Sequence, residues 1–299
     1  MQLKLTRRQF GQLAIFSTTI AAVGAVINQT LAQESNKDPV ILGIKTGLRD
    51  NNAPTNLDSD IIDPFEESQI TEPSALQPLI VESLNVRTQE IQTLLTTAPI
   101  LETCERLSGF ASINGKLIAA ASYTCTRKKK DKKVRLIDLY SLESVNLSGL
   151  KNNEDLYQLM RLANGSLGGL VGKDKGKGFS RIVTIDLNTG QITDRKKVPE
   201  QKRVTAVAES SGGSLYGINT DKLGEIALSQ IGDKQSKQLK YRGMSMNDGC
   251  DGLVWTPSNE LYALLAFRYE SPKYLHRINR STGEMERIQG FDVAKIALE

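Results

Sequence analysis

The sequence predicts an all-β chain arranged as a single β-propeller, and three observations carry this prediction. First, a tight turn recurs with its leucines 50, 48 and 46 residues apart. Second, each turn leads into a short apolar run, as in a strand leaving a hairpin. Third, units of about 45 to 50 residues that can each supply four strands are typical of propeller blades. The four copies of the turn are NGKL (114–117), NGSL (164–167), GGSL (212–215) and SNEL (258–261).

Each unit is expected to form four antiparallel strands, a to d, with tight turns between a and b and between c and d. Asn188-Thr189-Gly190 and Ser281-Thr282-Gly283 provide the second turn in two units, because glycine adopts positive φ readily. A pair of β-sandwiches is the alternative, but it gives no reason for four units in register.

The four units leave segments at both ends of the chain, and these predict a fifth blade. Residues 39–44 are typical of one strand, and residues 78–95 of strands c and d with a turn near Arg87 to Gln89. Residues 291–299 would then supply the innermost strand. Pairing of the two ends would close the ring and remove two exposed sheet edges.

The units also resemble those of quinoprotein-like and YVTN-type propellers. The stretch ELYALLAF…LHRINRSTGEMERI carries the resemblance, which covers residues 106–290. It implies the fold alone, because these propellers host many unrelated activities. The Gly-His and Trp-Asp marks of WD40 units are absent, and the single tryptophan, Trp255, is expected in the core.

The first 32 residues have the basic start, apolar stretch and small-residue end of an export signal. The stretch TRRQF, with Arg7, Arg8 and Phe10, resembles the twin-arginine translocation signal; an ordinary secretory signal is the alternative. The apolar part is 15 residues long, whereas a membrane span needs about 20. We therefore expect recognition by the twin-arginine translocase, cleavage near Ala32, no stable membrane insertion, and a mature domain of residues 33–299 in the periplasm or a thylakoid lumen.

Charge is distributed unevenly along the chain. The formal net charge is +4, of which the signal contributes +3, whereas residues 33–105 sum to −9 and residues 106–299 to +10. Residues 50–75 contain seven acidic and no basic residues, and we expect them to form a flexible loop between strands b and c of the first blade.

Lysine-rich stretches are expected in the b to c connections of the other blades, including those with Lys222 and Lys273. They predict a basic rim on one face that binds an anionic polysaccharide, a lipid head group or an acidic protein. The alternative is that these lysines only keep the loops soluble. No aromatic residues are interleaved, which argues against nucleic acid as the partner. The candidate ligand-binding residues are Arg127, Lys128, Lys129, Lys130, Lys132, Lys133, Lys173, Lys175 and Lys177.

The chain has three cysteines, which allow one disulfide and one leftover thiol. Counted outward from a two-residue turn at Asn114-Gly115, Cys104 falls opposite Cys125, so we expect a disulfide between them. Two unconnected thiols are the alternative. Cys250 is expected to be a packed thiol.

No motif for a cofactor or a metal is present, and the sequence favours a binding or scaffold role over catalysis. His276 is the only histidine, which excludes a multi-histidine metal site, and we expect it to be structural. A carbohydrate-active hydrolase or lyase is the alternative function, since such enzymes use paired carboxylates. The candidate catalytic acids, all in loops expected on the face of the basic rim, are Asp248, Asp251, Glu102 and Glu105.

Overall fold

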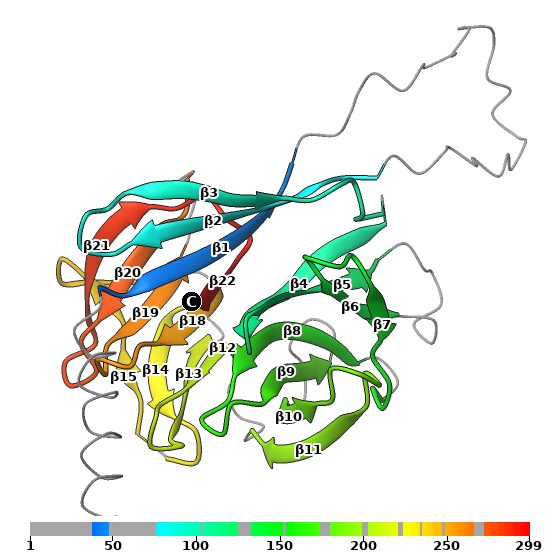
Figure 1. The fold of residues 1–299 in the computed structure, drawn as a ribbon. Helices are drawn as coiled ribbons and strands as arrows, with labels where there is room; N and C mark the ends of the chain where they lie inside the picture. Colours follow the sequence, from blue (N-terminus) through cyan, green and yellow to red (C-terminus); the bar gives the residue numbers. More distant parts are fainter. Residues whose placement is uncertain are drawn as a thin grey trace, which may run out of the picture. The chain divides into compact units, whose positions relative to one another are not determined.

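The strands form five sheets around a common centre (Figure 1). The computed structural model describes residues 38–47, 76–102, 104–124, 133–151, 154–173, 180–198, 203–220, 224–233, 235–246, 249–265 and 272–299. The predicted signal peptide and the acidic stretch 50–75 lie outside these residues. Within the described part of the chain, no helix has the length and apolar character needed to cross a membrane.

Each sheet is one blade, and its strands run from the centre outward in the order a to d. Blade one is β22 (Lys295–Leu298), β1 (Val40–Thr46), β2 (Leu79–Asn85) and β3 (Ile91–Thr96). Blade two is β4 (Glu105–Ile113), β5 (Lys116–Tyr123), β6 (Val134–Asp138) and β7 (Ser144–Asn146). Blade three is β8 (Glu154–Arg161), β9 (Leu167–Lys173), β10 (Arg181–Ile185) and β11 (Ile192–Lys197). Blade four is β12 (Arg203–Glu209), β13 (Leu215–Thr220), β14 (Ile226–Gln230) and β15 (Lys237–Gln238). Blade five is β18 (Cys250–Trp255), β19 (Leu261–Leu265), β20 (Tyr274–Ile278) and β21 (Glu284–Gly290).

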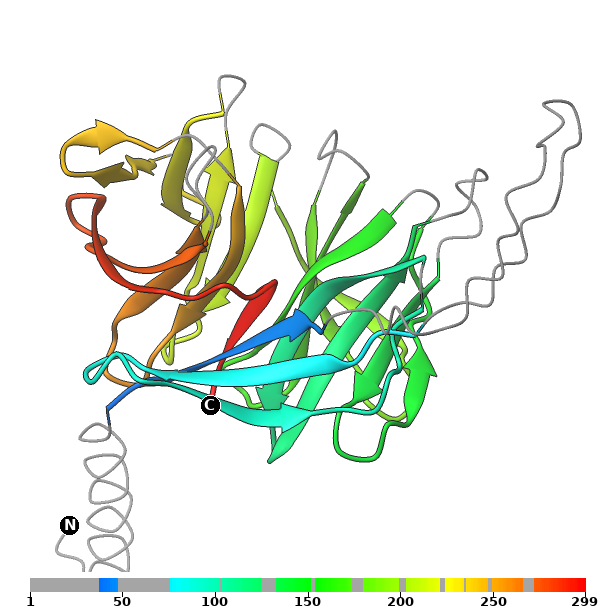
Figure 2. The same ribbon diagram turned by 90° about the horizontal axis from the view of Figure 1, so that it is seen from above.

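The ring closes as the sequence predicts. β22, from the C-terminus, pairs antiparallel with β1, so that Ile41 lies opposite Leu298 and Gly43 opposite Ile296 (Figure 2). The innermost strands contact one another in turn, and β22 contacts both β18 and β4. The prediction of five four-stranded blades closed by the two chain ends is therefore confirmed.

Blade five carries an addition that the sequence did not predict. A hairpin of β16 (Lys240–Tyr241) and β17 (Met244–Ser245) continues its sheet, and β16 runs parallel to β21. The turn residues Arg242 and Gly243 both have positive φ, which is typical of a two-residue hairpin turn. The hairpin covers the outer edge of β21, an edge that would otherwise offer unpaired backbone groups.

The hydrophobic core is divided among the spaces between neighbouring blades. Alternate side chains of a strand point to opposite faces, so one strand serves two cores. Phe110 of β4 packs between blades one and two, and the next residue, Ala111, packs between blades two and three. Three further apolar clusters fill the spaces between blades three and four, four and five, and five and one.

Four of the five innermost strands are bulged at equivalent positions. The extra residues are Ser108, Tyr157, Thr205 and Asp251, where the pairing with the second strand shifts by one. A bulge bends a strand and redirects its side chains. The glycine after two of these bulges lets neighbouring blades approach closely, because a Cβ on Gly252 would lie 2.5 Å from a side-chain carbon of Ile296.

Turns between strands c and d share one arrangement in four blades. A side-chain oxygen of Asn85, Asp138, Asp186 or Asn279 accepts hydrogen bonds from the backbone N–H groups two and three residues later. The fourth residue after each has positive φ: Gln89, Leu142, Gly190 and Gly283. The glycine turns and the turn near Arg87 to Gln89 were predicted; the positive φ of Gln89 and Leu142, which are not glycines, was not.

Both the backbone angle and the close surroundings at position 283 favour glycine over any other residue. Its φ is 80°, and an added Cβ would lie 2.2 Å from the carbonyl oxygen of Gln238. We expect Gly283→Ala to lower the free energy of unfolding by about 2–3 kcal/mol, about 1 of it from the left-handed backbone alone. Gly224→Ala is the matched control, because Gly224 has φ of 87° with no atom within 4 Å of its added Cβ. Denaturant unfolding of both variants measures the difference, and equal losses would contradict the expectation.

Candidate functional site at the mouth of the axis

One end of the ring, here called the b–c face, holds the starts of the innermost strands and the connections from the second to the third strand of each blade. Lys133 immediately precedes β6 and Lys173 ends β9, so both flank such connections, and both are exposed. The other candidate ligand-binding residues lie outside the described residues: Arg127, Lys128, Lys129, Lys130, Lys132, Lys175 and Lys177. Its ability to bind a ligand stays a prediction.

Five charged side chains gather where the innermost strands begin, and we call them the axial cluster. Arg106 of β4 donates from Nη2 to Oδ2 of Asp155 on β8 at 2.6 Å. Lys273, just before β20, has its Nζ 2.8 Å from Oδ2 of Asp251 on β18. Lys295, the first residue of β22, has its Nζ 4.0 Å from Oδ1 of Asp251. The cluster thus joins four blades and carries one more positive than negative charge.

Lys295 is the most enclosed cation of the cluster. Its side chain is 15% exposed, against 27% for Lys273 and 49% for Arg106. Burial lowers the pKa of Lys295 below its ordinary value; Asp251 opposes this, while Lys273 and Arg106 add to it by charge repulsion. Its ammonium makes no hydrogen bond to any described residue.

Asp155 is a buried carboxylate that ties two blades together. Its side chain is 5% exposed and accepts hydrogen bonds from Arg106 and, at 2.7 Å, from Ser122 Oγ of β5. Buried charges are retained where they are paired and hydrogen-bonded in this way. Arg106, in contrast, reaches solvent and keeps donors beyond the one that Asp155 accepts.

Glu105, a candidate catalytic acid, belongs to a structural clamp. Arg135 of β6 binds both of its carboxylate oxygens at 2.6 Å and also donates to the carbonyl oxygen of Ile100. Glu105 accepts a further hydrogen bond from the backbone N–H of Glu102, a second candidate, which is itself exposed. The carboxylate is therefore occupied in holding the crossing into blade two.

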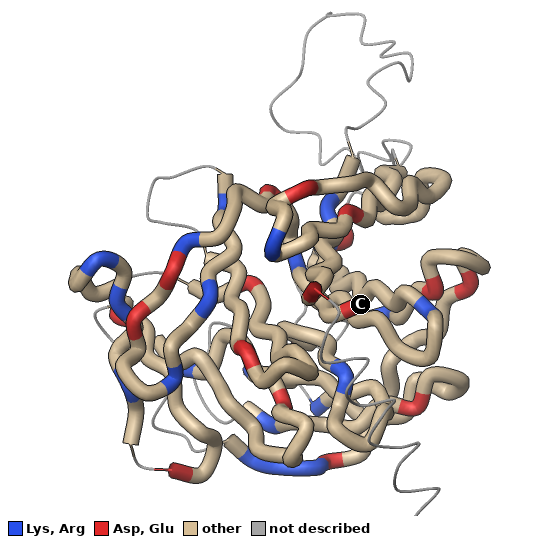
Figure 3. The backbone as a smooth tube through the Cα atoms, turned by 60° about the vertical axis from the view of Figure 1, so that its left-hand side comes forward, with Lys and Arg blue, Asp and Glu red and all other residues tan. Residues whose placement is uncertain are grey.

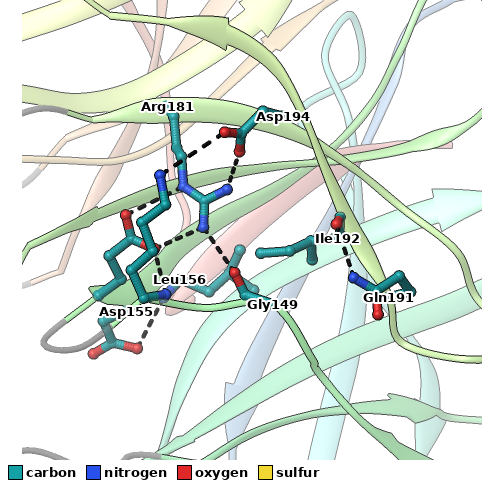
Figure 4. Close-up of polar contacts among 9 residues, drawn as sticks. Gly149, Asp155, Leu156, Arg181, Gln191, Ile192 and Asp194 are labelled. Carbon is teal, nitrogen blue, oxygen red and sulfur yellow. Dashed lines mark hydrogen bonds and ion pairs between the residues drawn. The ribbon is translucent and has the colours of Figure 1, made fainter.

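Blade three repeats this clamp with Glu154 and Arg181 (Figure 4). Arg181 binds both oxygens of Glu154, at 3.2 and 2.6 Å, and also donates to Asp194 and to the carbonyl oxygen of Gly149. Burial alone would raise the pKa of Glu154, but the hydrogen bonds from Arg181 and from the backbone of Lys151 hold it below its ordinary value. The repetition in two blades supports a structural role for Glu105.

The remaining catalytic candidates are Asp251 and Asp248. Asp251 is the bulged residue of β18, and its two oxygens face the lysines of the axial cluster. Asp248 lies outside the described residues. Across the described ranges, no group of three or more His, Cys, Asp or Glu side chains could hold a metal ion.

The axis is crossed one layer deeper by Gln158 of β8. Its side-chain amide donates to the carbonyl oxygens of Val207 and Leu253, at 3.0 and 3.1 Å, and accepts from the Val207 N–H at 2.8 Å. Gln158 occupies the position after the bulge, where the equivalent residues are Gly109, Ala206 and Gly252. One long side chain at this position therefore bridges blades three, four and five.

His276 and Trp255 occupy packed positions in blade five. His276 is fully buried, with Nδ1 3.1 Å from the carbonyl oxygen of Tyr274 and the rings of Tyr241 and Tyr274 beside it. Burial lowers the pKa of His276 to about 4, so the imidazole is neutral at physiological pH. Trp255 belongs to the core between blades four and five, as expected.

The cysteines follow the prediction in part. Cys104 is disulfide-bonded, whereas Cys250 is a free, buried thiol whose pKa is raised by burial to about 12. The register used to place Cys104 was wrong, because the bulge at Ser108 shifts the pairing and sets Cys104 beside Thr124. Cys125 lies outside the described residues, so the identity of its partner stays a prediction.

Comparison with known proteins gives no family. No family model matches the chain, and no curated protein matches it. Among solved structures it is similar to oligogalacturonate lyase in complex with manganese, at 14% identity and a TM-score of 0.38, covering 72% of this chain and 62% of that one.

Two further solved structures have the same degree of similarity. A catalytically inactive virginiamycin B lyase from Staphylococcus aureus with quinupristin is 14% identical, with a TM-score of 0.36 and coverage of 83% of this chain and 74% of that one. A putative gluconolactonase is 14% identical, with a TM-score of 0.41 and coverage of 72% and 76%. Similarities of this degree carry no inference about the activity of this chain.

Proposed function

We propose that this chain is a binding module that takes an anionic partner on its b–c face. One observation carries the proposal: Arg106, Lys273 and Lys295, from three blades, meet at the mouth of the axis, where two described carboxylates pair with them. Cations that converge from separate elements create a positive field that a single surface lysine does not. An acidic polysaccharide fits this arrangement, because its repeated charges can follow the mouth outward.

The carboxylates favour binding over hydrolysis. Hydrolysis by paired carboxyl groups needs one group that holds and releases a proton while the other attacks or activates water. Asp251 lies between two lysines, and Asp155 is bound by Arg106 and Ser122. Both are therefore occupied by cationic or hydroxyl partners.

The export of this module is part of the proposal. The twin-arginine-like start, with Arg7, Arg8 and Phe10, would deliver a folded domain to the periplasm or a thylakoid lumen.

Retention on heparin, a sulfated polysaccharide, tests the proposal. We expect Arg106→Gln with Lys273→Gln to weaken binding about fivefold at low salt, because exposed ionic contacts contribute about 0.5 kcal/mol each. Binding should also decline as salt is raised. The matched control is Lys116→Gln with Arg87→Gln, which removes the same charge from turns at the opposite end of the blades. If the two double variants bind equally, the axial cluster is not the binding site.

A further inference from the structure

Lys295 has a setting that differs from the chain's surface lysines. It begins the innermost strand of blade one, and the backbone of β22 is fixed there by its pairing with β1, with Lys295 opposite Ile44. Its side chain is mostly enclosed, yet it remains partly open at the mouth of the axis. The paired strand fixes the backbone of Lys295, and the enclosure of its side chain restricts the position of the amine.

The amine has no close hydrogen-bonding partner among the described residues. Its nearest acid, Asp251, is 4.0 Å away, and the other oxygen of Asp251 is taken by Lys273 at 2.8 Å. An enclosed ammonium without close acceptors is costly, because it has lost water without gaining hydrogen bonds. The site therefore favours either a ligand that supplies an acceptor or the neutral amine.

The charged groups around Lys295 act in both directions. Asp251 favours the charged amine, while burial, Lys273 and Arg106 favour the neutral one, and the net effect lowers the pKa. Neutral lysine is a nucleophile, and desolvation together with a second cation is a known way to produce it near neutral pH.

We propose that Lys295 is a reactive amine that condenses with the carbonyl group of a small anionic aldehyde or ketone held in the axial cluster. The amine nitrogen bonds to the carbonyl carbon, both amine hydrogens leave with the carbonyl oxygen as water, and a C=N bond remains. No oxidant or reductant is needed. Asp251 is near enough to relay a proton, and Arg106 and Lys273 supply the charge that attracts the anionic end.

The test is reductive trapping on the full chain. Glyoxylate, an anionic aldehyde, is added with cyanoborohydride, which reduces the imine, and modified lysines are located by peptide mass mapping. We expect Lys295 to be modified faster at neutral pH than Lys116 and Lys151, because a lowered pKa leaves more of its amine neutral and able to attack the carbonyl carbon. Those two lysines are far more exposed, at 59% and 66%.

Two comparisons decide which part of the proposal holds. With acetaldehyde, a neutral aldehyde, the preference for Lys295 should shrink, and Lys273→Gln should reduce the preference for glyoxylate. Lys45→Gln is the matched control for Lys273→Gln. Lys45 lies in blade one, like Lys295, but it pairs with Glu82 and lies outside the axial cluster. Modification of Lys295 no faster than Lys116 overturns the reactive amine, and equal rates with both aldehydes overturn the anionic ligand class.

These readouts are independent of polysaccharide binding, although both inferences concern the same cluster. A chain that binds heparin but shows no selective trapping at Lys295 overturns the reactive amine alone. A chain that is trapped selectively but ignores heparin overturns the proposed function alone. Lys295→Arg keeps the positive charge but removes the amine that forms the imine, so it should abolish trapping at this position.

Discussion

A chain that ends at Gly290 is expected not to fold. The deleted residues 291–299 contain β22, the innermost strand of blade one, and the buried side chains of Phe291, Val293 and Ile296. Each such side chain contributes about 1.5–3 kcal/mol by leaving water, so the loss approaches the 5–15 kcal/mol of a typical domain's total stability. The deletion also exposes an edge of β1 and opens the ring between β18 and β4.

Circular dichroism and denaturant unfolding of the shortened chain measure this effect. Asp292→Ala in the full chain is the matched control, because Asp292 lies in the deleted segment but is exposed. It should unfold like the unmodified protein. A synthetic peptide of residues 289–299 should restore structure to the shortened chain by supplying β22. Cooperative unfolding of the shortened chain at the same denaturant concentration as the full chain would show that closure by the terminal strand is not needed.

The fold was predictable because its signals are local and repeated. The tight turns lie within a few residues of sequence, and the apolar runs after them are short and uninterrupted, as in buried strands. The turn near Arg87 to Gln89 was also predictable, but nothing in the sequence indicates that Gln89 and Leu142 adopt the left-handed backbone angle that usually favours glycine. The bulges left no clear mark either, and the one at Ser108 defeated the register argument for Cys104.

The candidate site was less predictable because ring closure assembles it. Asp251 was singled out from its loop, but Lys295 joins it only when the last strand returns to the centre. Arg106 and Asp155 are 49 residues apart and meet because consecutive blades place equivalent ends together. The charged residues at the start of each innermost strand, taken together with the predicted repeat, could have indicated these contacts from the sequence. Elsewhere both basic and acidic positions are scattered over the described backbone (Figure 3).

Replacing Gln158 by leucine is expected to lower the free energy of unfolding by about 3–5 kcal/mol, because three buried backbone groups lose a partner at about 1–3 kcal/mol each. Gln158, Val207 and Leu253 are all at most 2% exposed, so water does not easily replace the amide. Denaturant unfolding measures the change. Gln92→Leu is the control, since Gln92 is an exposed glutamine on β3 whose amide binds only the side chain of Glu90.

Gln158→Glu makes the same interaction depend on pH. A carboxylate at this position would face two carbonyl oxygens in a buried site, so the folded state should hold the acid in its protonated form and raise its pKa. A carboxyl group whose pKa is raised on folding contributes stability below its unfolded pKa of about 4.3, and this is lost as pH rises toward the folded pKa. The deficit of Gln158→Glu relative to the unmodified chain should therefore grow between about pH 4 and 7, whereas that of Gln158→Leu should stay constant. If the two variants instead lose the same unfolding free energy at every pH, the Gln158 amide only fills space at the axis. Its hydrogen bonds to blades four and five would then contribute little.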